Sequence, residues 1–274
     1  MAFVAACATT APAQPWEPRL AGNAIVLLGE VHDNAAQHRL RLALLRRAFA
    51  AGWRPAIVME QFDVDRQADI ERARREQPRD AQHLIDQATI RAARPGAGWN
   101  WAFYKPYVTL ALEYDVPLLA ANLAAADTRR IVRGGLAASF DDQRLAALGL
   151  HRAIAPEWQQ AQESEIDRSH CGALPATVWT RMAQAQFARD AVMADVLRRH
   201  AERGAVLLAG NGHGRRDLGV PRWLDAEAPR VFALGLVERD DTHTPPGAFD
   251  ATLRTEAAER SDPCADFKPP AAGG

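Results

Sequence analysis

The sequence predicts an α/β protein: a mainly parallel central sheet flanked by helices, with an additional helical segment. Short apolar runs of the kind found in strands buried on both faces alternate with segments of helical period. The 274 residues are 48% apolar and 24% charged, which is enough to bury a full core. Because single α/β domains reach about 250 residues, one large domain is expected, with two domains as the alternative.

The first part of the chain alternates between strand and helix. Residues 24–28 form an apolar run that predicts a strand, and residues 56–59 form another. Between them a helix is expected to begin at an Asp33 or Asn34 cap and to continue through Phe49. Strand, helix and strand in this order predict a parallel βαβ unit.

The later elements follow from the same periods and from Gly and Pro punctuation. In chain order we expect a charged helical stretch at 63–94, a Gly- and Trp-rich break at 95–101, a helix near 104–114, a strand at 116–121, helices joined by turns over 125–170, a long helix at 175–203, and strands at 205–209 and 231–236. Residues from 240 onward are rich in Pro, Asp and Thr, which predicts a poorly regular tail.

Charge and composition exclude several kinds of function. The 33 basic and 34 acidic residues give a net charge of -1, and nucleic-acid binding needs a concentrated basic face. The lysines Lys105 and Lys268 both lie outside Gly-rich strand-to-helix turns, so a P-loop is excluded. No apolar window approaches the ~18 residues of a membrane-spanning helix.

Polar side chains follow each of the first four predicted strands, and these are Glu30 and His32, then Glu60, then Asn122, then Asn211 and His213. Ligands of parallel sheets bind outside the carboxyl ends of the strands, so these side chains are expected to meet at one edge. For any one such turn alone helix capping is the preferred explanation, but four together reverse that preference and favour a functional site.

Glu30, His32, Glu60 and His213 are the candidate catalytic residues and also the candidate metal ligands. Carboxylate and imidazole together are suitable ligands for a divalent metal. The same groups can perform metal-free hydrolysis in which a histidine is the general base and a glutamate orients it. The spacing of the residues leaves both interpretations open.

The long helix carries polar residues inside its apolar stripe. Gln186 and Arg189 fall within that stripe, and Asp190 lies at its margin. Buried polar groups need partners, so we expect either a charge network that fixes the helix or direct contact with a ligand.

Aromatic side chains gather beside the Gly-rich break. Trp99, Trp101, Tyr104 and Tyr107 are close in sequence. Core packing accounts for such a cluster, and an exposed cluster would suit a flat apolar ligand.

The cysteines suggest an extracytoplasmic protein. The pattern at 4–7 matches a lipobox, with Cys7 as the lipidated residue, although the preceding apolar segment is short for a signal peptide and an accidental match stays open. We expect residues 1–19 to be a truncated signal, lipobox and tether, and 266–274 to be a disordered tail. Cys171 and Cys264 then form an even pair that an oxidising compartment would allow to bridge, the alternative being two reduced thiols.

As an ordered set, the motifs over residues 20–265 resemble the ChaN-like haem-uptake lipoproteins, in the larger group that contains the Tiki and TraB proteins and the erythromycin esterases. The motifs are Leu28-Gly29-Glu30-Val31-His32-Asp33, Met59-Glu60-Gln61-Phe62-Asp63, the loop 101–104, His170-Cys171-Gly172-Ala173-Leu174-Pro175, the segment 186–190 and Gly210-Asn211-Gly212-His213. The resemblance implies a haem- or iron-binding protein of the bacterial cell envelope, in the outer membrane or periplasm and held by a lipid anchor.

Two functions are therefore expected. The first is haem or iron binding in uptake, with haem or a small molecule as ligand, a second copy of the chain as a candidate partner, and a phenolate or imidazole as axial ligand. The candidate ligand-binding residues are Asn122, Gln186, Arg189, Asn211, Tyr104 and Tyr107. The alternative is a metal-dependent or Glu/His-based hydrolase, of esterase or peptidase type, like the wider relatives.

Overall fold

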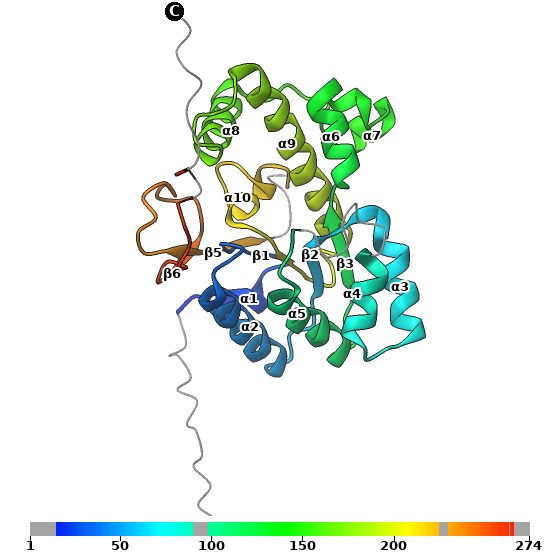
Figure 1. The fold of residues 1–274 in the computed structure, drawn as a ribbon. Helices are drawn as coiled ribbons and strands as arrows, with labels where there is room; N and C mark the ends of the chain where they lie inside the picture. The colour runs from blue at the N-terminus through cyan, green and yellow to red at the C-terminus, as the bar shows by residue number, and fades with distance from the viewer. Residues whose placement is uncertain (1–14, 90–97, 225–229, 263, 266–274) are drawn as a thin grey trace, which may run out of the picture.

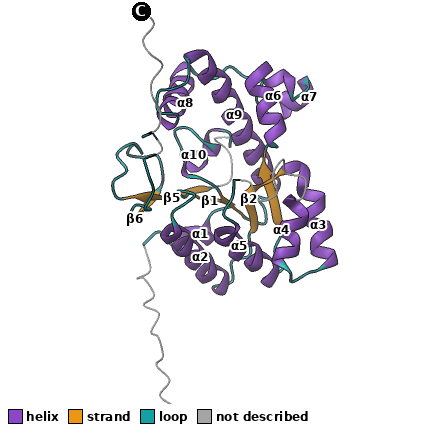
Figure 2. Ribbon diagram, in the orientation of Figure 1, coloured by secondary structure: helices purple, strands orange, loops and turns teal. Residues whose placement is uncertain are grey.

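A computed structural model describes residues 15–89, 98–224, 230–262 and 264–265. Within them lies a six-stranded, all-parallel sheet with the strand order β3-β2-β4-β1-β5-β6 (Figures 1 and 2). The strands are β1 (Ile25–Leu28), β2 (Ala56–Asp63), β3 (Leu118–Asn122), β4 (Ala205–Leu208), β5 (Val231–Glu238) and β6 (Ala251–Thr255). The predicted fold class is confirmed.

The helices of the described residues are α1 (Pro18–Gly22), α2 (Ala35–Ala50), α3 (Gln67–Glu76), α4 (Ala81–Thr89), α5 (Trp101–Glu113), α6 (Ala125–Gly134), α7 (Asp142–Leu148), α8 (Pro156–Ser169), α9 (Ala176–Arg199) and α10 (Asn211–Gly214). Short 3-10 helices occur at Val64–Arg66, Leu136–Ala138 and Val220–Arg222.

Helices cover both faces of the sheet because successive residues of each strand point to opposite sides. In β1, Val26 and Leu28 belong to the apolar cluster shared with α1, α2 and α5, whereas Ile25 and Leu27 belong to the cluster shared with α9. Figure 1 shows α2 and α5 on one side of the sheet and α9 on the other. Both faces are therefore buried, which explains the continuous apolar runs.

The predicted additional helical segment packs on the outer side of α9. Helices α6, α7 and α8 contribute Ile131, Leu148 and Trp158 to a third apolar cluster, and α9 contributes Phe187. In Figure 1 these helices form a lobe above the carboxyl end of the sheet. The lobe is thus placed to close one side of any site at that edge.

Asn34, rather than Asp33, caps helix α2. The Asn34 side chain accepts hydrogen bonds from the backbone N–H groups of Ala36 and Gln37, both at 3.1 Å. The Asp33 carboxylate instead pairs with Arg260 at 2.8 Å. Of the two candidate caps, the structure thus selects Asn34.

The charged stretch from 63 onward is largely helical over its described residues, and it consists of a 3-10 turn and two helices, α3 and α4, separated by the turn that holds Pro78. One expectation about local structure is wrong. The region after 240 is not uniformly irregular, since Ala251–Thr255 forms the edge strand β6, parallel to β5. Its alternating burial fits an edge position, where backbone pairing compensates for a short sequence with little apolar character.

The described part of the N-terminal segment already packs on the domain. Trp16 stacks against Phe232 of β5 with the ring centroids 6.1 Å apart, and α1 buries Leu20. The lipobox with Cys7 and the predicted tail 266–274 lie outside the described residues. Within those residues, none of the helices is long and apolar enough to cross a membrane.

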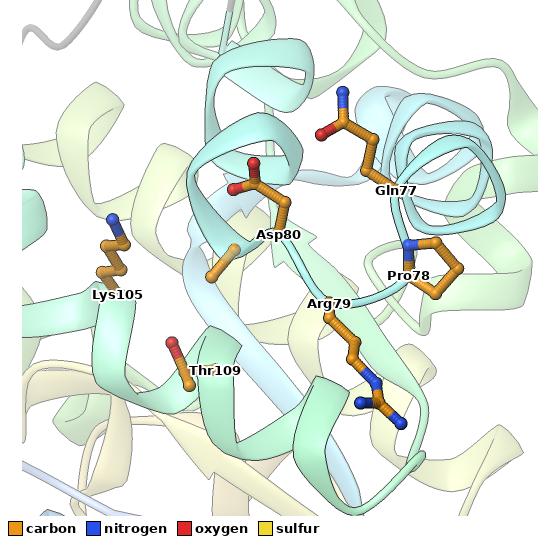
Figure 3. A pocket seen from close by; sticks show the side chains of 7 residues that line it. Gln77, Pro78, Arg79, Asp80, Lys105 and Thr109 are labelled. Carbon is orange, nitrogen blue, oxygen red and sulfur yellow. The ribbon is translucent and has the colours of Figure 1, made fainter.

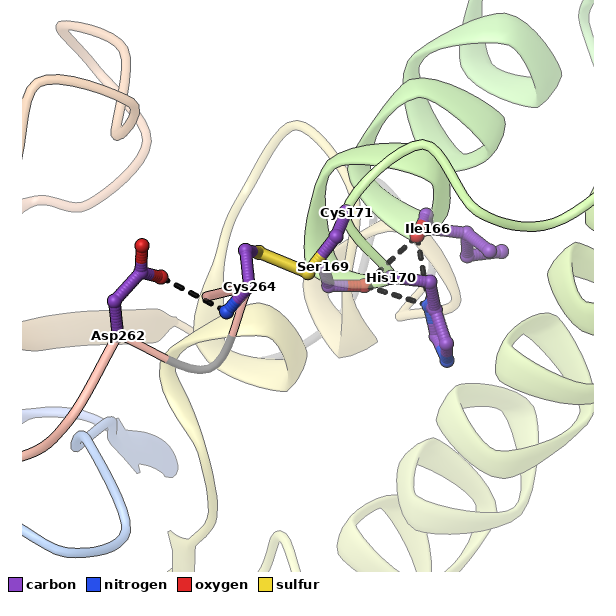
Figure 4. The surroundings of a disulfide bond; sticks show 6 residues. All are labelled: Ile166, Ser169, His170, Cys171, Asp262 and Cys264. Atoms are coloured by element: carbon purple, nitrogen blue, oxygen red, sulfur yellow. Dashed lines mark hydrogen bonds between the residues drawn. A yellow bond between two sulfur atoms is a disulfide. The ribbon is translucent and has the colours of Figure 1, made fainter. Parts of the chain in front are cut away.

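Cys171 and Cys264, the candidate pair from the sequence, form a disulfide (Figure 4). Their Cα atoms lie 5.5 Å apart, and the bond joins the end of α8 to the segment after β6. Arg260, in that segment, also binds Glu238 of β5 at 2.6 Å. The C-terminal segment is therefore tied both to the sheet and to the helical lobe.

Removing this disulfide should destabilise the protein. The bond closes a loop with a sequence separation of 93 residues, for which the chain-entropy model gives about 4 to 5 kcal/mol. We expect the variant with Cys171→Ser and Cys264→Ser to unfold at a clearly lower urea concentration than the oxidised parent. Cys7→Ser, which leaves the pair intact, is the control, and equal midpoints for all three proteins would contradict the prediction.

Candidate functional site

Glu30, just beyond β1, is the centre of a buried cluster of polar side chains. One carboxylate oxygen, Oε2, lies 2.7 Å from the Arg41 guanidinium and 3.0 Å from Nδ1 of His38, both on α2. The other, Oε1, accepts a hydrogen bond from the Tyr104 hydroxyl of α5 at 2.7 Å and lies 3.1 Å from Nδ1 of His32. The first strand, α2 and α5 therefore meet at one carboxylate.

The charge of Glu30 is fixed by its surroundings. Burial alone raises the pKa of this carboxyl, but the Arg41 guanidinium and hydrogen bonds from His32 and His38 outweigh burial and lower the pKa to about 2. Arg41 is fully buried and also donates to the Leu28 carbonyl. Glu30 is consequently a carboxylate at neutral pH.

His32 is the member of this cluster that faces solvent. Its side chain is 48% exposed, whereas that of Glu30 is fully buried. Nδ1 faces Glu30, and within the described residues Nε2 makes no hydrogen bond. The ring meets Trp99 edge to face at a centroid distance of 4.9 Å. The structure thus leaves about half of the His32 side chain open to solvent and places a buried carboxylate against Nδ1 of the ring.

Tyr104 and Tyr107 lie in the core, not on an exposed aromatic surface. Both are fully buried. The Tyr107 hydroxyl donates to the His38 carbonyl at 2.9 Å and accepts from Arg41 at 3.1 Å. Burial raises the pKa of Tyr104, and the Glu30 carboxylate raises it further. Both phenols therefore support the Glu30 cluster as neutral hydrogen-bonding groups.

Glu60, at the end of β2, occupies a second buried cluster. Its Oε1 pairs with Arg189 of α9 at 2.6 Å, and its Oε2 accepts from the Gly210 backbone N–H at 2.8 Å. The same guanidinium donates to Asn122 at 2.9 Å and to Gln186 at 2.8 Å. This is a buried charge network of the kind expected from the polar residues within the apolar stripe of α9. It contains four of the candidate residues: Glu60, Arg189, Asn122 and Gln186.

His213 is held between two carboxylates. Its Nδ1 lies 2.5 Å from Asp190 and its Nε2 lies 3.4 Å from Glu60. Burial and the nearby Arg189 lower the pKa of His213, but the two carboxylates outweigh them and raise it to about 9. Burial also raises the pKa of Asp190, an effect that the His213 imidazolium partly offsets. At neutral pH the imidazole is therefore protonated.

Gly210 joins the two clusters. Its N–H binds Glu60, and its Cα lies so close to His32 that an added Cβ would stand 2.8 Å from the imidazole Cε1. Any larger residue there would displace His32. The structure thus brings Glu30, His32, Glu60 and His213 to the carboxyl edge of the sheet. They form two clusters, and Gly210 contacts a member of each.

The remaining predicted roles find less support in this geometry. The Asn211 amide donates to the Leu236 carbonyl at 2.6 Å, which ties α10 to β5. Within the described residues, no three of His, Cys, Asp and Glu are placed to hold a metal ion. Arg41 already pairs with one oxygen of Glu30, and Arg189 already pairs with one oxygen of Glu60.

A cavity of about 400 Å³ opens beside the second cluster, between α6, α8, α9 and α10. Arg189, Asp190 and His213 line one wall of it. A larger hollow, of about 750 Å³, lies between the α3–α4 turn and α5 (Figure 3). Its lining, which includes Lys105 and Thr109, shares no residue with the two clusters.

Sequence reasoning missed His38 and Arg41. Both lie on α2 one helical turn apart, and Arg41 is one further turn before the buried apolar residues Leu44 and Leu45. A polar residue inside an apolar stripe was the signal that identified Arg189 on α9. Applied to α2, the same signal would have indicated a buried partner for Glu30.

Replacing Arg41 should destabilise the protein by leaving Glu30 unpaired. For Arg41→Met we expect the free energy of unfolding at neutral pH to fall by about 3 to 5 kcal/mol. Arg39→Met, an exposed position on the same helix, is the control and should change it by less than about 0.5 kcal/mol.

The deficit of Arg41→Met should also depend on pH. In the parent, the Glu30 pKa of about 2 lies below its ordinary value of 4.5, so the stability that the pair contributes is complete above pH 4.5 and is lost as the pH falls towards 2. The two proteins should therefore converge in stability over that window, as urea unfolding curves would show. A deficit independent of pH would mean that lost packing, not charge, is responsible.

Comparisons with known proteins agree with the motifs. No curated protein matches the sequence. Among solved structures, a ChaN of Campylobacter jejuni, described as showing cofacial heme binding, is similar with a TM-score of 0.65 at 18% identity, over 80% of this chain and 84% of that one. An erythromycin esterase, EreC, in its open conformation has a TM-score of 0.44 at 14% identity, over 84% and 76% of the two chains.

The first of these similarities supports the fold alone. The sequence carries the family assignment, because the match extends through both clusters and the helical lobe. Residues 17–224 match the family described as haem-binding uptake, Tiki superfamily, ChaN, and the chain belongs to that family.

Proposed function

We propose that this protein is a haem-binding lipoprotein of the cell envelope that functions in haem or iron uptake, and that His32 is the residue that binds the haem iron. The observation that carries the proposal is the half-exposed imidazole, whose Nδ1 faces a buried carboxylate and whose Nε2 makes no hydrogen bond in the described structure. Membership of a haem-binding family supports it.

The residues present suit this ligand. Neutral imidazole is a common axial ligand of haem iron, and a carboxylate behind the ring increases its basicity and fixes its orientation. Glu30 is such a carboxylate, and Arg41 keeps it ionised. A phenolate from Tyr104 or Tyr107 is disfavoured, because both hydroxyls are buried and burial raises both pKa values.

The open position of His32 bears on the geometry of binding. Trp99 and Phe103 lie beside the cluster with partly exposed rings, and they offer apolar contact to the flat face of a porphyrin. A haem bound at a surface histidine keeps one face uncovered. A second haem brought by another copy of the chain would cover it, an arrangement in keeping with the cofacial binding described for the similar ChaN structure.

A Glu/His hydrolase is the weaker candidate. The residue nearest to the cavity, His213, has a pKa of about 9 and is protonated at neutral pH, so it is a poor general base there. Glu60 is an equally poor acid, because its ion pair with Arg189 and its contact with His213 help to hold its pKa well below the usual range against the effect of burial. These groups are better suited to holding fixed charges than to moving protons.

The test of the haem site is the single change His32→Ala. We expect the affinity for haem to fall at least about tenfold, with a changed Soret band, because the axial nitrogen is lost. The melting temperature should stay close to that of the parent, since the side chain is half-exposed.

His151→Ala, at another exposed histidine, is the control for nonspecific binding to surface imidazoles. It should leave the titration unchanged. Parent-like affinity and an unchanged spectrum in His32→Ala would show that another residue holds the iron.

The lipid anchor is proposed from Cys7 and its lipobox, and the disulfide supports an oxidising compartment. When the chain is expressed behind a complete lipoprotein signal in a bacterium, the mature protein should incorporate labelled fatty acid and sediment with membranes. Cys7→Ser should abolish both. Labelling that persists in Cys7→Ser would refute the anchor while leaving the haem site untouched.

A further inference from the structure

The cavity of about 400 Å³ beside the second cluster is lined by Arg189, Asp190 and His213 but not by His32. Four elements enclose it: α6, α8, α9 and α10. Its volume lies within the usual range for small-molecule sites. Neither His32 nor Trp99 contributes to its lining, so it is distinct from the proposed haem surface.

The charged groups around the cavity already have partners. Arg189 pairs with Glu60 at 2.6 Å, and Asp190 contacts His213 at 2.5 Å. Glu165, also in the lining, contacts Arg215 at 3.3 Å. Because each charge is compensated from behind, the cavity offers no free charge to attract an ion.

Gln162 is the exception among the polar groups, because its amide has no protein partner. Residue Gln162 of α8 is only 5% exposed and lines the cavity, and within the described residues its side-chain amide makes no hydrogen bond. The amide atoms are not among the sealed polar atoms of the described residues, so they can be reached from the cavity. Such an amide in the wall of a cavity points to a ligand that completes its hydrogen bonds.

Two further groups in the lining have unused hydrogen-bonding capacity. The Gln186 oxygen accepts from Arg189, which leaves its NH₂ group free to donate. In His170, Nδ1 lies 2.8 Å from the Ile166 carbonyl and so carries the proton, which makes Nε2 an acceptor in the neutral ring (Figure 4). Val132, Met182 and Leu218 supply apolar surface between these groups.

We infer that this cavity binds a small uncharged molecule that carries an amide group, and that Gln162 recognises the amide. A carboxamide is the natural partner of another amide, because each donates one N–H and accepts one through its oxygen. A charged ligand would have to leave its charge unpaired in a cavity whose own charges are compensated. An N-acetylated sugar and a capped amino acid share the required chemistry, with a methyl group suited to the apolar surface.

The probes are N-acetylglucosamine and N-acetylalanine methylamide, titrated by ligand-observed NMR into the full chain with its disulfide intact. We expect saturable binding of at least one of them and markedly weaker binding of glucosamine, which carries an ammonium in place of the acetamido group. Absence of saturable binding for both probes, or equal binding of glucosamine, would overturn the inference.

Gln162→Leu tests the residue itself. It removes two hydrogen bonds to the probe, so the affinity should fall at least about tenfold. Because the amide has no protein partner, the melting temperature should stay the same or rise. Gln160→Leu, the same change at an exposed position of α8, should bind the probe like the parent. A lower melting temperature together with unchanged probe affinity would make Gln162 a structural residue and refute its role.

His32→Ala separates this inference from the proposed haem site. It should retain probe binding, and the parent saturated with the probe should still bind haem. Displacement of the probe by haem would show that the cavity is part of the haem site and would overturn the separate pocket. If neither the parent nor His32→Ala binds haem while both bind the probe, the result would contradict the haem proposal and leave this inference standing.

Discussion

The buried ion pair between Glu30 and Arg41 is the interaction on which the site depends. It joins the end of β1 to α2, and through Tyr104 it also reaches α5, so three elements are fixed relative to one another by one carboxylate. A pair buried this completely is weak evidence for stability, because the cost of desolvating both charges offsets most of their attraction. Its evident effect is positional: the guanidinium keeps Glu30 ionised, and the ionised carboxylate orients His32 at the surface.

The end of β2 also carries a buried carboxylate paired with an arginine, but the neighbouring histidine is in a different electrostatic environment. Glu60, like Glu30, is a buried carboxylate paired with one arginine, but it contacts one histidine where Glu30 contacts two. Asp190 adds a second carboxylate on the far side of His213, and the pair of negative charges raises the pKa of that imidazole to about 9. His32 has only one carboxylate behind it and has solvent in front. One histidine is therefore an internal cation, whereas the other is half-exposed and is the proposed haem ligand.

Much of this arrangement could be predicted from the sequence, because the carboxyl ends of parallel strands must meet at one edge. That rule placed Glu30 and Glu60 together without any knowledge of the helices. It could not provide Arg41, since which face of α2 meets the strand end depends on packing. It also gave no means of telling a buried Tyr104 from an exposed one, because aromatic spacing is the same in both cases. The edge strand β6 was missed because backbone pairing, and not apolar side chains, stabilises it.

A short series of contacts connects the proposed haem ligand His32 with the lining of the cavity beside α9. Gly210 touches the His32 ring on one side, and its N–H binds Glu60 on the other. Glu60 in turn holds Arg189, which lines the cavity. A ligand in the cavity that shifted Arg189 would have to move Glu60 and then the glycine against which His32 rests. Because the chain of contacts is short and each member is buried or tightly packed, coupling between the sites requires no change in the sheet, only a displacement at its carboxyl edge.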